Sequence, residues 1–186
     1  IILSILLILY KYIFMATTLN LDGKWKVLAQ PLSAKGETGL RKVKRVRGGW
    51  IEARVPGEIH LDLKRAGKMP EPLDSTNAPA CRWPEKKSWW YRTSVNVSPG
   101  LFAHERIELI FEGLDLYAQV FLNGKLVGEA QNAFVPAVFD AKPFLKRGRN
   151  DLVVRLTVGT ELADKGLNPT RYTREEPYRN RYFDGM

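Results

Sequence analysis

The sequence predicts an all-β protein, a sandwich of antiparallel strands with one short helix, on three observations. From Asn20 onward apolar side chains recur mainly every second residue, which is the spacing of half-buried strands. Asn123-Gly124 separates two such runs and supplies the two positive φ angles of a type I′ hairpin turn. Seven or eight short strands divided by turn signals are typical of a β-sandwich.

The first strands are expected between residues 25 and 55. Apolar residues alternate with lysines over 25–29, and a second short run covers 50–55. Residues 31–39 contain Pro, Ser, Gly and Thr and are interpreted as a loop. The basic run 41–47 alternates with valines, which is typical of the solvent face of an edge strand, where charge discourages aggregation.

The one helix that the sequence predicts covers Glu58–Ala66. Ile59 and Leu63 stand at helical spacing, and Gly67 follows where a helix ends. The next stretch, 69–87, contains four prolines and is interpreted as a long irregular loop. Long loops on compact domains are uncommon and are often functional.

After this loop, five strands are expected at short intervals. Each shows alternating apolar residues, and the third and fourth form the hairpin around Asn123-Gly124. The strands cover residues 90–97, 105–111, 116–122, 125–130 and 152–158, with a turn at 147–150 before the last one.

The first fourteen residues, Ile1–Phe14, are mostly apolar and are left out of the predicted fold. They fall short of the ~20 residues that a helix needs to cross a bilayer, so no stable membrane span is predicted. One interpretation is the remnant of a signal peptide, although Lys11 interrupts the run. The favoured one is a spurious upstream extension, because Met15 is a natural start for a soluble domain.

Length and composition indicate a single domain that does not bind nucleic acid. The 186 residues, 45% of them hydrophobic, suffice for one core, whereas a (β/α)₈ barrel alone usually needs ~250 residues. The net charge of +9 is compatible with a polyanion, but the basic run is interpreted as a solvated strand face and no nucleic-acid-binding motif accompanies it. We therefore expect no nucleic-acid partner.

Cysteine and histidine are too few for a metal site. Cys81 is the only cysteine, so the chain forms no internal disulfide and no cysteine-based zinc cluster. The two histidines, His60 and His104, are far apart and are interpreted as ordinary side chains. No cofactor is predicted. The sequence does not fix the location of the protein, and a cytoplasmic one is slightly favoured over secretion.

Three segments in order resemble the N-terminal jelly-roll domain of glycoside hydrolase family 2 enzymes, especially the β-mannosidases and exo-β-glucosaminidases. They are Val55–Pro72, Glu85–Val97 and Glu105–Leu156, within a resemblance that covers Leu21–Leu156. A strand followed by Asn-Gly is common in unrelated proteins, whereas three segments with the family's order and spacing are specific evidence.

The resemblance implies a galactose-binding-domain-like sandwich that precedes an immunoglobulin-like domain and a catalytic barrel. We expect a jelly-roll domain at 15–158 and, at 159–186, the truncated tail of the same domain leading toward those missing domains. In such enzymes two barrel glutamates carry out retaining hydrolysis, so no catalytic residue is assigned here. The family's Trp-Asp loop, which closes the sugar subsite, does not occur before Met186. The implied partners are a β-mannoside or related glycoside and the missing domains.

Four residues of the proline-rich loop are candidates for substrate binding: Asn77, Arg82, Trp83 and Trp89. Sugar recognition combines hydrogen-bond donors with flat apolar faces, and these residues supply both. The resemblance places Asn77 where the family's loop approaches the active site. The competing interpretation is that the tryptophans pack in the sandwich or against a neighbouring domain.

The favoured function is a non-catalytic domain that shapes the sugar pocket of a β-mannosidase-like hydrolase and braces its barrel. The alternative is a free-standing carbohydrate-binding module of the same sandwich class. A module would bind sugar without the barrel, whereas an accessory domain depends on it.

Overall fold

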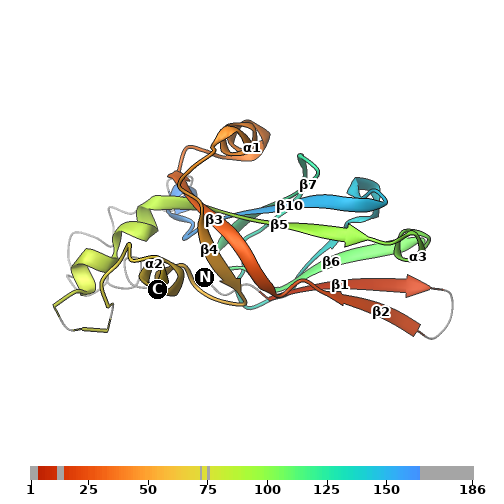
Figure 1. Cartoon of the computed structure of the whole chain (residues 1–186), viewed down its shortest axis with the longest axis horizontal. Coiled ribbons are helices and arrows are strands. Elements are labelled where there is room, and N and C mark those ends of the chain that lie inside the picture. Colours follow the sequence, from red (N-terminus) through yellow and green to blue (C-terminus); the bar gives the residue numbers. More distant parts are fainter. Residues whose placement is uncertain (1–3, 12–14, 72, 75, 164–186) are drawn as a thin grey trace.

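The computed structural model describes residues 4–11, 15–71, 73–74 and 76–163. In these residues ten strands form two antiparallel sheets that lie in two layers (Figure 1). The larger sheet has the order β4-β3-β5-β10-β7-β8, and the smaller one the order β2-β1-β6-β9. The strands are β1 Ser4–Lys11, β2 Met15–Asn20, β3 Gly23–Pro31, β4 Ile51–Val55, β5 Lys87–Val97, β6 Arg106–Gly113, β7 Tyr117–Leu122, β8 Lys125–Ala130, β9 Ala137–Asp140 and β10 Gly148–Thr157.

Short helices connect these strands. They are α1 Gly36–Arg45, α2 Ile59–Arg65, α3 Pro99–Phe102 and α4 Thr160–Ala163, with the 3₁₀ turns η1 Ala78–Cys81, η2 Trp83–Lys86 and η3 Lys142–Phe144. The expected helix at 58–66 is confirmed as α2, and Gly67 after it has a φ of 66°. The expectation of a single helix is corrected by the others. None of the described helices is long and apolar enough to cross a membrane.

The sandwich core confirms the predicted fold class. The inward face of the larger sheet contributes Trp25, Tyr91 and Val154, which pack in one cluster with Leu109 and Phe111 of β6. These side chains are buried because alternate residues of each strand face the same side. Full burial of each large apolar side chain stabilises the fold by about 1.5–3 kcal/mol.

The hairpin from β7 to β8 is confirmed. Asn123 and Gly124 have φ angles of 52° and 93°, and Leu122 pairs with Lys125 across the turn. The register shifts between Val120 and Phe121, which marks a bulge.

The basic run at 41–47 was expected on an edge strand and lies instead mostly on α1. Leu40 and Val43 are buried against the outer face of the larger sheet, where they pack with Trp90 of β5. In Figure 1 α1 lies across this outer face. The spacing of Leu40, Val43 and Val46 is three residues, a helical period. Gly39 allows the close approach, since a Cβ there would lie 2.8 Å from the carbonyl carbon of Ala34.

The N-terminal segment that was left out of the predicted fold contains a strand. The backbone of β1 pairs antiparallel with β2 on one side and with β6 on the other, Leu7 opposite Leu109. The exclusion of residues 1–14 is therefore corrected for Ser4–Lys11. A short apolar run is compatible with a strand as well as with part of a signal peptide.

Two further boundaries differ from expectation. The turn expected at 147–150 ends earlier, because β10 begins at Gly148 and Asn150 is fully buried. β9 was not predicted, since four residues give too short an alternation, and it pairs with β6. Most of the expected tail at 159–186 lies outside the described residues.

Candidate functional site

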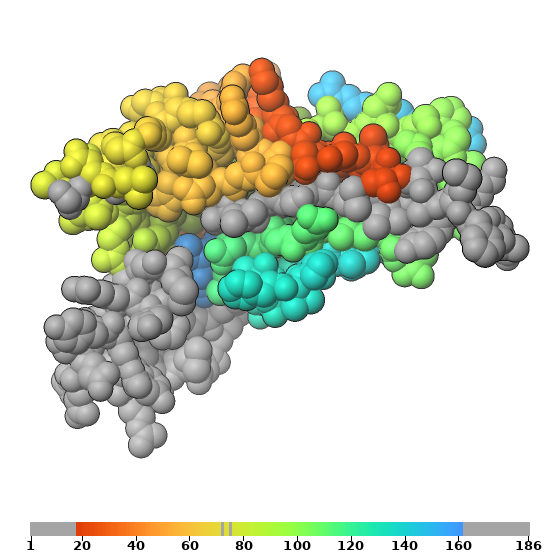
Figure 2. Space-filling model, turned by 90° about the horizontal axis from the view of Figure 1, so that it is seen from below, coloured from red at the N-terminus to blue at the C-terminus, as the bar shows by residue number. Residues whose placement is uncertain are grey.

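The strand register brings several connections to the same end of the sandwich, which we call the loop end. Trp89 pairs with Leu156, Leu156 with Ala118, and Ala118 with Ala130. The connection from α2 to β5, the connection from β8 to β9, and the exit of β10 therefore share this end. Figure 2 shows the first connection in yellow and the region of the second in cyan on one face of the molecule.

The connection from α2 to β5 is tied down by local bonds. Lys64 of α2 forms an ion pair with Glu71. The hydrogen bond that the Lys64 ammonium donates in this pair lowers the pKa of the Glu71 carboxyl. The Asn77 side-chain amide donates to the Glu71 carbonyl oxygen at 3.1 Å, and the Asn77 carbonyl accepts from the Cys81 N–H. Cys81 is buried in the core. Asn77 is thus held half-buried in a braced loop.

The two candidate tryptophans form a tilted pair with ring centroids 5.7 Å apart and an interplanar angle of 51°. Trp83 is partly buried, whereas Trp89 is only 2% exposed and donates its indole N–H to the Pro84 carbonyl oxygen at 3.0 Å. The structure therefore assigns Trp89 to the core, as the packing interpretation expected, and its ring has no face open to a ligand. Trp83 is the ring of this pair that reaches the surface.

Arg82 lies between η1 and η2 and is exposed. Its guanidinium lies 3.8 Å from the Glu85 carboxylate, at a distance that permits an ion pair but a weak one. Asn77, Arg82 and Trp83 thus fall on one short stretch at the loop end, with Trp89 behind Trp83.

The connection from β8 to β9 was not singled out as a site from the sequence. Its Phe134 side chain is 94% exposed. Residues from Glu129 to Phe139 line an open pocket of about 280 Å³ beside it. No sequence signal identifies such a residue, because an apolar side chain in a loop is usually interpreted as part of the core.

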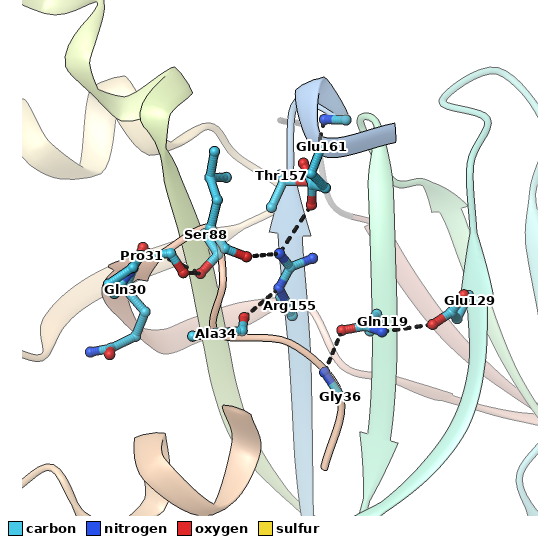
Figure 3. Close-up of polar contacts among 12 residues, drawn as sticks. Gln30, Pro31, Ala34, Gly36, Ser88, Gln119, Glu129, Arg155, Thr157 and Glu161 are labelled. Carbon is cyan, nitrogen blue, oxygen red and sulfur yellow. Dashed lines mark hydrogen bonds and ion pairs between the residues drawn. The ribbon is translucent and has the colours of Figure 1, made fainter. Parts of the chain in front are cut away.

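A buried arginine at the exit of β10 was also missed. Arg155 is fully buried, and it donates to the carbonyl oxygens of Ala34 at 2.8 Å and Leu32 at 2.9 Å (Figure 3). It also donates to Glu161 at 3.0 Å, which accepts a second bond from the Thr157 hydroxyl at 2.8 Å. These bonds tie the exit of β10 to the connection between β3 and α1.

The buried carboxylate of Asp62 is held by hydrogen bonds within the fold. Asp62 is fully buried, and it accepts from the Arg54 N–H and from Arg65. Burial raises the pKa of Asp62, although these partners oppose the rise. Burial, together with the charges of Asp62 and Glu58, raises the pKa of Tyr91. Among the described residues no group of three or more His, Cys, Asp or Glu could hold a metal ion.

Comparisons with known proteins identify a family that this chain matches. Residues 29–182 match the family described as glycosyl hydrolase 2 galactose-binding domain-like. A β-mannosidase B from Thermothelomyces thermophilus is 34% identical over 102 residues, which are 55% of this chain and 12% of the relative. The crystal structure of a β-D-mannosidase from Dictyoglomus thermophilum covers 79% of this chain, with a TM-score of 0.67 and 33% identity, and this chain spans 16% of that protein.

A more distant structure shares the fold alone. It is a β-glucuronidase from Bifidobacterium dentium, solved with coumarin-3-O-glucuronide, with a TM-score of 0.55, 24% identity, and coverage of 83% of this chain and 20% of the other. The chain thus spans under a quarter of the length of each relative described.

Proposed function

Because the chain belongs to the glycosyl hydrolase 2 galactose-binding domain-like family, we propose that it is the non-catalytic N-terminal domain of a longer β-mannosidase-like hydrolase. The parent would hydrolyse terminal β-mannosides or related β-glycosides. The observation that carries this proposal is the pair of coverages: the sandwich matches a β-mannosidase over 79% of this chain but over 16% of that enzyme.

The proposed role of the loop end is to complete a sugar pocket. Asn77 and Arg82 would supply hydrogen-bond donors, and Trp83 a flat apolar face for the C–H side of a pyranose. Trp89 would act indirectly, because its ring supports Trp83 from the core at 5.7 Å. The braced backbone around Asn77 supports this role, since a pre-ordered loop loses little entropy on binding.

Bond cleavage is assigned to the rest of the parent enzyme. Retaining glycosidases need two carboxyl groups ~5–5.5 Å apart across the scissile bond. The carboxylates of Asp62 and Asp151 in this domain are held by cations and hydrogen bonds of the fold, at separate places. The remaining partners of the domain would be the immunoglobulin-like and barrel domains of the same polypeptide.

Activity on an aryl β-mannoside tests the proposal. The 186-residue chain and the longer polypeptide encoded by the same reading frame would be purified and compared. We expect hydrolysis by the longer polypeptide alone. Hydrolysis by the short chain, or a reading frame that ends directly after Met186, would contradict the proposal.

Variants of the longer polypeptide test the sugar contacts. Asn77→Ala and Trp83→Ala should each raise KM about five- to thirtyfold, because a lost hydrogen bond or ring face weakens sugar binding by about 1–2 kcal/mol. The matched controls are Asn96→Ala, an exposed amide on β5, and Trp50→Ala, a half-buried ring on the opposite face of the larger sheet. Equal KM values for the site variants and the controls would contradict the proposal that this loop contacts the sugar.

Calorimetric titration separates the alternative function. A carbohydrate-binding module would give specific affinity for a mannoside with the 186-residue chain alone. An accessory domain should give none at millimolar sugar, since most of the pocket would be missing.

A further inference from the structure

An apolar knob stands out from the loop end. We define it by Phe134 and Val135 of the β8–β9 connection and Val138 of β9, which are 94%, 56% and 51% exposed. Isolated apolar residues on a surface are ordinary, but here three exposed apolar residues fall within residues 134–138 of the chain. Phenylalanine is also enriched in the buried centres of protein interfaces.

The knob is built on an ordered base. The Phe134 N–H donates to the Asn132 side-chain oxygen at 2.9 Å, which is a local turn that fixes the backbone just before the ring. Pro136 restricts the other side of the loop. Below it, Phe139 packs edge-on against Phe111 in the core, with centroids 6.0 Å apart. A loop with an ordered backbone of this kind loses little backbone entropy when it is covered.

The pocket beside the knob gives a partner something to fill. Its volume is about 280 Å³, and its wall combines apolar residues such as Val135 and Pro136 with the polar Glu129, Gln131 and Asn132. An apolar centre with a polar rim is the anatomy of a protein–protein interface.

The position of the knob indicates which partner covers it. Ala130, at the start of the connection, pairs with Ala118, which pairs with Leu156 at the end of β10. Neighbouring strands lie ~4.8 Å apart, so the exit of β10 is about 10 Å from the base of the knob. Arg155 and Glu161 hold that exit in place. The chain that follows β10 therefore starts near the knob.

We propose that the knob docks into an apolar surface of the domains that follow this one in the longer polypeptide. This inference rests on the proposed function. The relatives support this occupant by their length, because the chain spans only 12% and 16% of two β-mannosidases that it resembles. The knob and its pocket would form the contact by which the sandwich braces the rest of the enzyme.

Thiol labelling tests the proposal directly. Cys81 is buried, so a cysteine introduced on the surface gives the main signal with a membrane-impermeant maleimide. Phe134→Cys and Val138→Cys would be labelled in the 186-residue chain and in the longer polypeptide. The control is Lys125→Cys, an exposed position next to the hairpin turn at the opposite end. Thermal melts would confirm that each variant is folded.

Docking predicts that both knob cysteines react at least about tenfold more slowly in the longer polypeptide than in the short chain, because covered groups react only after opening. The control should react equally in both. Equal labelling of the knob in both forms would overturn the inference, while β-mannosidase activity of the same preparation would leave the proposed function standing. Protection already in the short chain that rises with concentration would identify a second copy as the occupant and also overturn it. A reading frame that ends after Met186 would contradict both the proposed function and this inference.

Discussion

The two ends of the sandwich differ in how they are completed. At the end that contains the β7–β8 turn, which we call the hairpin end, two side-chain amides close the structure with their own hydrogen bonds, those of the buried Asn150 and the partly buried Asn123. The Asn150 side chain accepts from the Lys146 N–H at 2.8 Å and from the Asn123 amide at 2.7 Å, and it donates to the carbonyls of Lys146 and Gly148. The same Asn123 amide donates to the Phe144 carbonyl oxygen at 2.8 Å.

The loop end keeps apolar surface and chain exit together instead. Phe134 is 94% exposed, Trp83 is partly exposed, and Arg155 anchors the point where β10 ends. The hairpin end meets its hydrogen-bonding needs within this chain, whereas the loop end has the features of a surface that another part of a protein covers. Stability is therefore expected to depend on polar networks at both ends, but recognition on the loop end alone.

The largest effect is expected from Arg155→Ala. This substitution removes the buried guanidinium that donates to Glu161 and to the carbonyls of Ala34 and Leu32, which should cost about 3–5 kcal/mol of unfolding free energy. Urea denaturation measures the cost. The control is Arg92→Ala, which removes a partly exposed ion pair with Asp151 and should cost below about 1 kcal/mol. Similar losses for the two variants would show that the buried network does not anchor the exit.

Asn150→Ala tests the closure of the hairpin end. The variant removes the fully buried side-chain amide that bonds three part-buried backbone groups of Lys146 and Gly148, so we expect a loss of about 2–3 kcal/mol in the free energy of unfolding. The exposed Asn96→Ala should change it by less than about 0.5 kcal/mol. Proton exchange at the Asn123 side-chain amide, followed by NMR, should accelerate in the variant. An unchanged exchange rate would speak against a shared network.

Gly124→Val should destabilise the hairpin by about 1 kcal/mol or more, because a β-branched residue is strained at a φ of 93°. Lys125→Val is the matched control, since this position lies in β8 with ordinary strand geometry. Thermal unfolding compares the two. A Gly124→Val protein that melts with the parent would exclude the positive-φ turn.

The smallest effects are pH-dependent and have opposite signs in two regions. Near α2, burial raises the pKa of Asp62 above its ordinary value of 3.8, against the opposing effects of Arg54 and Arg65. The folded state then binds the proton more tightly than the unfolded state, so this group's contribution to stability falls as pH rises from 3.8 through the folded pKa. The stability of Asp62→Asn relative to the parent should therefore increase as pH rises through this window.

Near the hairpin end the sign reverses. Burial alone would raise the pKa of Asp151, but hydrogen bonds and charges from Lys44 and Arg92 outweigh it and lower the pKa below 3.8. The stabilisation is present above 3.8 and is lost as pH falls through the lower folded pKa. Asp151→Asn should be less stable than the parent at neutral pH by below about 1 kcal/mol, and the difference should vanish in acid. Urea unfolding across this pH range checks both variants, and equal pH profiles would contradict the assignment.

The hairpin end could be predicted because its signal is local. Asn123-Gly124 specifies positive φ angles by itself, and the flanking alternation fixes the register. The helix α1 was missed because the basic residues between its valines were interpreted as a strand face, although Leu40, Val43 and Val46 stand at a helical spacing. A second signal lay in another element: β7 is buried at every position, which requires cover on both faces of the larger sheet.

The candidate site could be predicted from the sequence only in part, because some of its features depend on long-range contacts. Asn77, Arg82 and Trp83 were predicted from the sequence because amides, guanidinium groups and rings in a proline-rich loop are the groups that sugar binding uses, and they stay candidates. The burial of Trp89 is set by its long-range pairing with Leu156 and Ala29, which sequence spacing does not reveal. Arg155 was missed because a charge in a strand is normally placed in solvent, and Phe134 because an apolar side chain is normally placed in a core.

The central claim is that this sandwich is an accessory part of a longer sugar-cleaving enzyme, and the initial rate of aryl β-mannoside hydrolysis tests it most directly. The polypeptide that continues past Met186 should hydrolyse the substrate, and the purified 186-residue chain should give only the rate of the buffer. Turnover by the short chain, or its absence in a folded longer polypeptide with aryl β-mannoside and related β-glycosides alike, would contradict the account.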